Sequence, residues 1–232
     1  MNGGLTGKLE TEQKYEVGPE FTMPDLGGVG GSGVAAAPEV QLLVARYYDT
    51  ADLRLATARV TLRRRTGGQD AAWHLKLPVG GDTRREVHAP LGSGEEEVPA
   101  GLAELVATWT DGRPLRPVAT LQTRRTVWRI TGPGGEVLAE VADDLVTGHR
   151  DARPGPPGGP EAAAADLTWR EVEVELVSGQ PAILAAAGQR LRAAGARPSR
   201  SASKLSRVLA APPAEVQQPV RDAGGASAGV PS

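Results

Sequence analysis

Carboxylates recur at every second position in two segments of the chain. The segment KLETEQKYEV places charged residues at alternating positions: Glu10, Glu12, Lys14 and Glu16. The segment WREVEVEL does the same with Glu171, Glu173 and Glu175. If these segments are strands, each set lies on one face, with its members about 7 Å apart. Such rows repel themselves unless cations lie nearby, and carboxylates without histidine or cysteine suit Mg²⁺ or Mn²⁺.

Basic residues alternate in the same way on other segments. VTLRRRTG, WHLKLP, TRREVHAPL and LQTRRTVWRI place basic residues on one face of each expected strand: Arg63, Arg65, Lys76, Arg84 and Arg125. Arginine binds phosphate oxygens through its bidentate guanidinium. Each segment alone fits an amphipathic strand with a solvated face. A sheet closed with its apolar faces outward would instead line its interior with one acidic and one basic wall, which suits a polyphosphate bound with a divalent metal.

Composition excludes several other kinds of site. The net charge of −2 gives no basic field for nucleic acid, so we expect no nucleic-acid partner. The absence of cysteine excludes disulfides, thiolate metal sites and cysteine nucleophiles. Three scattered histidines, His74, His88 and His149, argue against a histidine-rich zinc site. No apolar run approaches the roughly 20 residues of a membrane span and no signal peptide opens the chain, which predicts a cytoplasmic protein without a membrane partner.

The elements that would position these residues are mostly strands. We expect eight, at about 5–17, 41–48, 58–65, 72–78, 84–89, 118–131, 137–147 and 168–177. Helices are predicted from Pro99 and from Pro181, because proline suits the first helical turn and apolar residues follow at helical spacing. A short third helix is predicted over Ser203–Ala210. Many strands and few helices favour an antiparallel sheet or barrel with helices outside it.

Three segments have the composition of loops or linkers: Pro24–Pro38, Arg153–Ala165 and Pro212–Ser232. None of them divides the chain into halves with separate cores. We therefore expect one domain over residues 1–210 and a disordered tail or linker over residues 211–232.

The motifs also resemble those of a known family. The chain is similar to the CYTH domains, or triphosphate tunnel metalloenzymes, whose hallmark E-x-E-x-K is present as Glu10, Glu12 and Lys14. YYDTADLRL, LRRR, HLKLP, RREV, EVADD, EVEVELVSG and SKLSR follow in the family's order. The resemblance covers about Lys8–Leu209. It implies an α+β fold: a closed eight-stranded antiparallel β-barrel that forms a tunnel, with helices packed outside.

Roles for individual residues follow from the resemblance. It implies metal ligands for Mg²⁺ or Mn²⁺ at Glu10, Glu12, Glu171, Glu173 and Glu175. It implies phosphate-binding residues at Arg63, Arg65, Lys76, Arg84, Arg125 and Lys204. Asp144 is expected to orient the attacking water, and Lys14 to set the protonation state of its neighbours. The choice of Arg84 over Arg85 assumes a register, because RREV offers both.

The resemblance implies a divalent-metal-dependent triphosphatase, with inorganic tripolyphosphate as the first choice of substrate. Thiamine triphosphatase activity, class IV adenylate cyclase activity and a non-catalytic polyphosphate-binding module are the alternatives. Expected partners are inorganic triphosphate or polyphosphate, a second copy in a homodimer, and a fused or separate CHAD-type domain. Few aromatic residues are available to stack on a base or a thiamine ring, although Tyr47, Tyr48, Trp73 and Trp128 are candidates.

Overall fold

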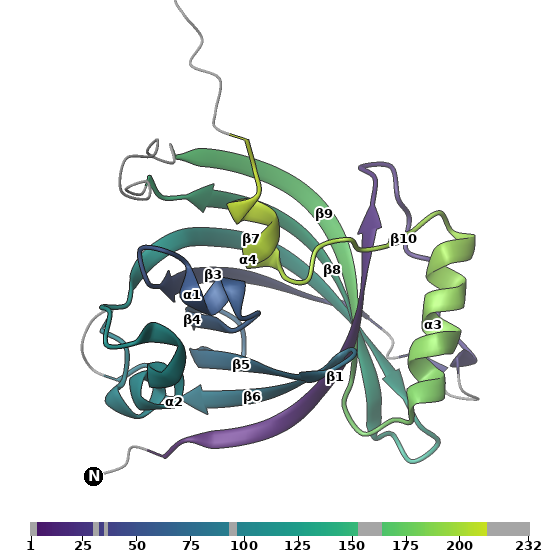
Figure 1. The fold of residues 1–232 in the computed structure, drawn as a ribbon. Helices are drawn as coiled ribbons and strands as arrows, with labels where there is room; N and C mark the ends of the chain where they lie inside the picture. Colours follow the sequence, from purple (N-terminus) through teal and green to yellow (C-terminus); the bar gives the residue numbers. More distant parts are fainter. Residues whose placement is uncertain (1–3, 30–32, 35–36, 93–96, 153–163, 213–232) are drawn as a thin grey trace, which may run out of the picture.

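The computed structural model describes residues 4–29, 33–34, 37–92, 97–152 and 164–212. Eight long strands form one antiparallel barrel (Figure 1): β1 Thr6–Val17, β3 Glu39–Asp49, β4 Thr61–Thr66, β5 Ala72–Gly80, β6 Thr83–Ala89, β7 Arg116–Thr131, β8 Val137–Arg150 and β9 Ala165–Leu176. The order is β1-β6-β5-β4-β3-β7-β8-β9, and β9 pairs back with β1. This pairing closes the barrel, as predicted.

The remaining elements are short. They are the strands β2 Gly33–Val34 and β10 Arg197–Pro198, and the helices α1 Arg54–Thr57, α2 Ala100–Thr110, α3 Pro181–Ala193 and α4 Lys204–Leu209. The predicted start of a strand at Ala58 is wrong, because α1 occupies the preceding residues and β4 begins only at Thr61. The Asp49 carboxylate holds this turn, since it accepts hydrogen bonds from the backbone N–H groups of Leu55 and Ala56.

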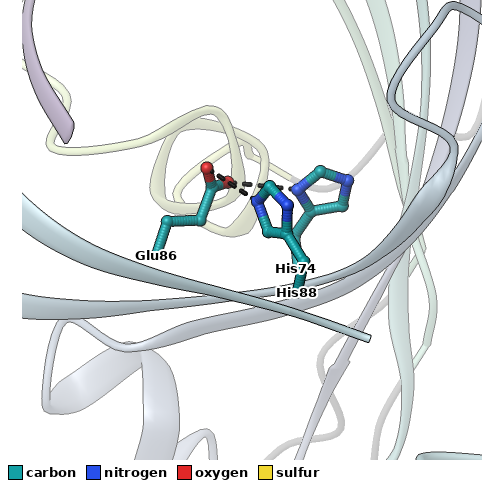
Figure 2. Close-up of side chains that lie close together, drawn as sticks. All are labelled: His74, Glu86 and His88. Atoms are coloured by element: carbon teal, nitrogen blue, oxygen red, sulfur yellow. Dashed lines mark hydrogen bonds and ion pairs between the residues drawn. The ribbon is translucent and has the colours of Figure 1, made fainter. Parts of the chain in front are cut away.

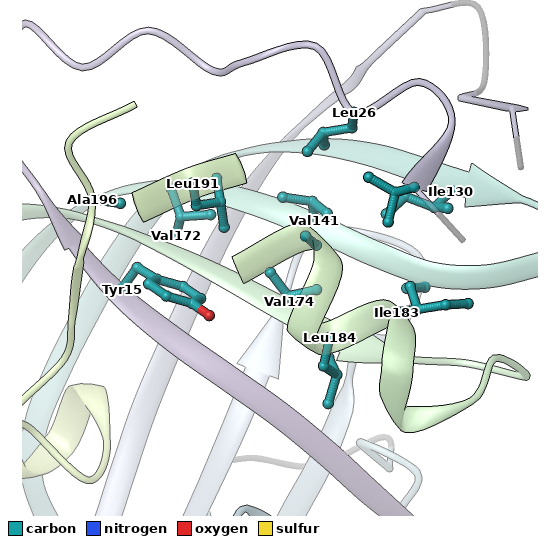
Figure 3. Packing of buried hydrophobic residues seen from close by; sticks show 13 residues of the cluster. Tyr15, Leu26, Ile130, Val141, Val172, Val174, Ile183, Leu184, Leu191 and Ala196 are labelled. Atoms are coloured by element: carbon teal, nitrogen blue, oxygen red, sulfur yellow. The ribbon is translucent and has the colours of Figure 1, made fainter. Parts of the chain in front are cut away.

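Two of the three apolar clusters lie outside the barrel. α3 covers one cluster that includes Tyr15, Val172, Val174 and Leu191 (Figure 3). α2 covers a second cluster that includes Leu62, Trp73, Leu75, Leu102 and Val106. Burying these side chains under helices supplies the hydrophobic stabilisation that an ordinary barrel obtains in its interior.

The charged residues of the same strands consequently face inward. On β1, Glu10 is 3% exposed and Glu12 is 7% exposed, whereas Leu9, on the opposite face of the strand, is 69% exposed. Burial of carboxylates is costly unless they are paired or hydrogen-bonded. The interior must therefore hold compensating cations.

α4 packs differently from α2 and α3. Its Leu205 and Val208 contact Trp169 of β9. Trp169 is two residues from Glu171, so both side chains lie on the same, inner face of the strand. α4 thus lies against the inner side of β7–β9, at one end of the barrel, and carries Lys204 inward.

Some predictions fall partly outside the described residues. Residues 213–232 of the predicted tail and residues 153–163 of the predicted loop Arg153–Ala165 lie outside the described residues. The boundary at residue 210 stays a prediction. Among the described residues, no helix combines the length and the apolar character that crossing a bilayer requires.

Candidate active site

A small cavity of about 50 Å³ lies inside the barrel, and we call it the lumen. Its walls are charged and come from strands distant in the sequence. Most of the predicted site residues line it: Glu10, Glu12, Lys14, Arg63, Lys76, Arg84, Arg125, Glu173, Glu175 and Lys204.

Lys14 lies between two carboxylates of the lumen. Its Nζ donates to Glu12 Oε1 at 2.5 Å and to Glu173 Oε1 at 2.9 Å. Lys14 and Glu173 are directly opposite in the β1–β9 register, so their side chains share a face. Burial opposes the charged ammonium, but Glu173 and Glu12 raise the pKa of Lys14 above its usual value. Lys14 is therefore a stable cation and a donor in the lumen, not a proton acceptor.

Arg125 binds two carboxylates at once. Its Nε and Nη2 donate to the two oxygens of Asp144 at 2.8 and 2.7 Å, and Nη2 also donates to Glu173 Oε2 at 2.7 Å. Asp144 is completely buried and stands opposite Arg125 in the β7–β8 register. Although burial alone would raise it, the charges of Arg125 and Lys204 lower the pKa of Asp144. The pair is a bidentate, charge-assisted contact of the kind that fixes a guanidinium in place.

Lys204 enters the lumen from the first turn of α4. Its Nζ lies 2.9 Å from Asp144 Oδ2, 2.6 Å from Glu171 Oε1 and 2.8 Å from Glu173 Oε1. A capping box starts the helix at this residue, because the side chains of Ser203 and Ser206 each accept from the other's backbone N–H. The cap therefore sets the position at which this ammonium meets the acidic wall.

Lys76 and Glu10 form the ion pair on the other side of the lumen. Lys76 Nζ lies 2.6 Å from Glu10 Oε2. Burial, together with the neighbouring charges of Glu12 and Glu175, nevertheless raises the pKa of Glu10 to about 7 despite the opposing effect of Lys76. Burial is the largest cause of this shift, so the charged form of Glu10 is costly in the free protein.

The structure distinguishes the two arginines of RREV. Arg84 lines the lumen, and its Nη2 donates to the Ala202 carbonyl at 2.9 Å, whereas Arg85 is exposed. Arg65 is buried but lies away from the lumen lining, paired with Asp70. Burial and the charges of Arg63 and Arg125 lower the pKa of Arg65 to about 9.

A larger groove of about 440 Å³ adjoins the lumen, and we call it the mouth. Glu12, Lys14 and Arg84 line both spaces. The mouth adds further cations from α3 and the loops: Arg59, Arg192 and Arg200. An anion that approaches the lumen from this side would meet positive charge first.

Two aromatic side chains form hydrogen bonds to charged residues of the site that were not predicted, and Tyr47 had been a candidate only for stacking. The Tyr47 hydroxyl accepts a hydrogen bond from Arg63 Nη1 at 3.2 Å, and Tyr47 lines the lumen. Trp169 Nε1 donates to Glu171 Oε2 at 2.6 Å. Trp169 lies two positions before Glu171, so the alternation that identified the carboxylates also contained the signal for the tryptophan.

The histidines are less scattered than the sequence indicated. His74 of β5 and His88 of β6 are directly opposite in the strand register, and Glu86 lies beside them (Figure 2). The argument against a histidine cluster is therefore wrong for these two residues, because strand pairing joins positions 14 apart in the chain. Only His149 lies elsewhere, hydrogen-bonded to Asp166.

The lumen carboxylates have the chemistry of a site for a hard cation. They offer oxygen donors only, which suits Mg²⁺ or Mn²⁺. Oxygens of Asp144, Glu171 and Glu173 lie within 4.8 Å of one another. The predicted donor set thus fits a divalent metal by donor type and charge.

Comparisons with known proteins agree with this architecture. The family model of the CYTH domain matches residues 8–208. Two curated Mycobacterium tuberculosis proteins, the uncharacterized proteins MT2285 and Rv2226, are each 39% identical over 207 residues. The match covers 88% of this chain and 40% of each relative, so the chain spans less than half of their length.

A solved structure has a similar fold. The crystal structure of a putative adenylate cyclase from Bacillus halodurans matches with a TM-score of 0.55 and 16% identity, over 87% of this chain and 97% of that one. At this identity the likeness concerns the fold alone. The inward-facing E-x-E-x-K of β1, the closed eight-stranded barrel and the family model over residues 8–208 lead to one conclusion: this chain belongs to the CYTH domain family.

Proposed function

We propose that the chain is a divalent-metal-dependent hydrolase of triphosphates and that its substrate is inorganic tripolyphosphate. The observation that carries the proposal is the lumen itself, where guanidiniums and ammoniums face carboxylates around one enclosed space. A metal–triphosphate complex matches both walls, because its oxygens attract the cations and its metal attracts the carboxylates.

The ion pairs of the lumen suggest how the substrate enters. Lys14, Arg125 and Lys204 all bind carboxylates in the free protein. A triphosphate would take over these cations, and the released carboxylates would become available to the metal. Each charge keeps a partner throughout, so the exchange avoids leaving an unpaired charge in the barrel.

We assign the metal to the predicted carboxylates Glu10, Glu12, Glu171, Glu173 and Glu175. Magnesium commonly binds one or two carboxylates and completes its coordination with phosphate oxygens and water. When bound, a divalent ion would neutralise phosphate charge and lower the pKa of a coordinated water.

The basic residues would position the phosphates. Arg63, Lys76, Arg84 and Arg125 would orient the chain and stabilise negative charge that develops on the leaving group. Both oxygens of Asp144 are engaged by Arg125, and one also contacts Lys204. Asp144 therefore positions these two cations in the free protein, and its predicted role in orienting the attacking water applies after the substrate has taken over the cations.

The locations of the aromatic residues favour an inorganic substrate. Tyr48 and Trp73 belong to the outer cluster under α2, and Trp128 packs against the cluster under α3. Of the four candidates for stacking, Tyr47 alone lines the lumen, and its hydroxyl is engaged by Arg63. Trp169 also lies on the inner face but is buried with Leu205 and Val208 of α4, so a nucleobase or thiamine ring would find little to stack on inside the barrel.

Phosphate release from a panel of substrates tests the proposal. The purified chain would be given tripolyphosphate, ATP, thiamine triphosphate or long-chain polyphosphate, with Mg²⁺ or Mn²⁺ and with EDTA as the control. We expect metal-dependent release, fastest from tripolyphosphate. Faster release from ATP or thiamine triphosphate would transfer the assignment to that substrate. Tight binding of long polyphosphate without release would identify a binding module and contradict hydrolysis.

A further inference from the structure

We propose that His74, Glu86 and His88 form a second metal site, specific for Zn²⁺, on the inner face of the β5–β6 hairpin (Figure 2). The ligand atoms of the three residues lie within 4.8 Å of one another. The proposed hydrolytic site has oxygen donors only, whereas this one has two imidazole nitrogens. It is therefore a separate site with a different metal preference.

Strand register brings the three side chains together. His74 is directly opposite His88, and Lys76 is directly opposite Glu86. Residues opposite each other in an antiparallel pair share a face, and so do residues two apart on one strand. His74, Glu86 and His88 must therefore point to the same side of the hairpin, which is the inner side that Lys76 also faces.

The tautomer of His74 leaves a lone pair facing Glu86. His74 Nε2 lies 3.0 Å from the Asp70 carbonyl oxygen, which only accepts hydrogen bonds, so Nε2 carries the proton. In the neutral ring Nδ1 then presents a lone pair to Glu86 Oε1, 3.1 Å away. Two acceptors in contact need a positive partner between them. The same backbone contact is the usual way in which a metal-ligating histidine is oriented.

A proton on His74 Nδ1 is an unfavourable partner. An imidazolium at His74 would be 1% exposed and close to Arg63 and Arg65, which repel it. A metal ion supplies the missing positive charge and satisfies both lone pairs.

His88 supplies the third ligand. Its Nε2 is shielded from solvent and lies 2.9 Å from Glu86 Oε2, but the contact lacks the geometry of a hydrogen bond. A neutral His88 with its proton on Nδ1 would present the Nε2 lone pair to an ion bound by Glu86. Both histidine contacts therefore converge on Glu86, one on each carboxylate oxygen.

The distances and donor types favour zinc. Zn²⁺ binds imidazole nitrogen and carboxylate oxygen at about 2.0–2.2 Å, so ligands of a tetrahedral ion lie about 3.4 Å apart. The His74 Nδ1–Glu86 Oε1 separation of 3.1 Å and the His88 Nε2–Glu86 Oε2 separation of 2.9 Å are each a few tenths of an ångström shorter than this. Water would be the fourth ligand. Imidazole favours zinc over magnesium, which prefers oxygen.

The nearby lysines do not block the site. Lys8 approaches Glu86 Oε2 at 3.7 Å, but its side chain is half exposed and its shorter contact is with Glu175 at 2.9 Å. Lys76 lies 3.8 Å from Glu86 Oε1 and binds Glu10 at 2.6 Å. Both lysines keep a closer carboxylate when Glu86 binds zinc, and the ion would cross-link β5 and β6 beside the lumen.

Calorimetric titration of Zn²⁺ into the untagged, EDTA-treated and dialysed chain tests the proposal. The variants are His88→Gln, the matched control His149→Gln, and the double variant Glu10→Gln/Glu12→Gln. We expect one zinc per chain in the unmodified protein, in His149→Gln and in the double variant. His88→Gln should bind zinc at least about tenfold more weakly, since even partners of metal ligands contribute that much to affinity.

A second readout separates zinc binding from folding and from hydrolysis. Far-UV circular dichroism should be unchanged in His88→Gln, and Co²⁺ should give tetrahedral visible absorption in the unmodified chain but not in this variant. Equal zinc affinity in His88→Gln and the unmodified chain would overturn the proposal. So would loss of zinc binding in Glu10→Gln/Glu12→Gln alone, because the ion would then belong to the carboxylates. Neither result depends on triphosphatase activity.

Discussion

The charged residues of the lumen are bound in ion pairs, so a substitution at one residue also affects its partner. Arg125 neutralises Asp144 and Glu173, which are 0% and 12% exposed in their side chains. Removing one partner of a buried ion pair costs about 3–5 kcal/mol of stability, because the remaining charge stays buried. An Arg125→Ala variant would therefore lose both stability and substrate binding, and its kinetics would not separate the two effects. Lysine keeps the charge and removes only the bidentate guanidinium.

We predict that Arg125→Lys raises KM for tripolyphosphate by roughly tenfold to a hundredfold. The variant loses a charge-assisted contact, and a hydrogen bond to a charged group contributes about 1.5–3 kcal/mol. Steady-state phosphate release at varied substrate concentration measures the change.

Arg129→Lys is the matched control for Arg125→Lys. Arg129 is on the same strand, but it binds Glu39 and Glu140 and does not line the lumen. KM should be unchanged in this control. An unchanged KM in Arg125→Lys, or an equal rise in both variants, would contradict the position assigned to Arg125 in substrate binding.

The sequence predicted which residues of each strand share a face, because the two-residue period of a strand is local. Glu10, Glu12 and Lys14 could be grouped from one segment alone. Contacts between strands depend on register, which the period does not set. The pairing of His74 with His88 was therefore missed, and the choice between Arg84 and Arg85 needed the structure.

The elements differ in how clearly the sequence predicted them. α3 begins at Pro181 as predicted, since proline suits the first turn of a helix. The four-residue α1 was missed, because buried hydrogen bonds to Asp49 hold it where no helical apolar period exists. The inward position of Lys204 depends on where α4 packs, and a six-residue segment does not reveal that.

Packing of α3 on the barrel depends on the small size of one residue. A Cβ atom on Gly188 would lie 2.0 Å from the Tyr15 hydroxyl, and Tyr15 is buried and donates to Gln13. We predict that Gly188→Ala destabilises the protein by about 1–3 kcal/mol, the usual cost of overpacking. Thermal unfolding should show a decrease of several degrees in Tm.

Gly101→Ala on α2 controls for helix propensity. There the added Cβ would meet the side chain of Leu5 at 3.3 Å, and Leu5 is 40% exposed and free to move. Alanine favours a helix over glycine by up to about 1 kcal/mol, so Tm should be equal or higher. A higher Tm in Gly188→Ala as well would contradict the tight contact between α3 and Tyr15.

At the scale of the whole molecule, closure of the barrel turns ordinary amphipathic strands into a charged enclosure. Each strand alone is compatible with a polar face in water, so no single segment decides the fold. The pairing of β1 with β9 is what brings Glu12 and Lys14 of the E-x-E-x-K motif opposite Glu175 and Glu173 on β9. Helices α2 and α3 then cover the apolar outer face that closure leaves exposed to solvent.

A crystal structure of the chain with tripolyphosphate in the presence of EDTA tests the central claim most directly, because removal of the proposed metal is expected to prevent turnover. The account predicts tripolyphosphate inside the barrel, with its oxygens within hydrogen-bond distance of Arg63 and Arg125 and with the Arg125–Glu173 contact broken. Tripolyphosphate bound only on the outer surface, with the ion pairs of the lumen intact, would contradict it.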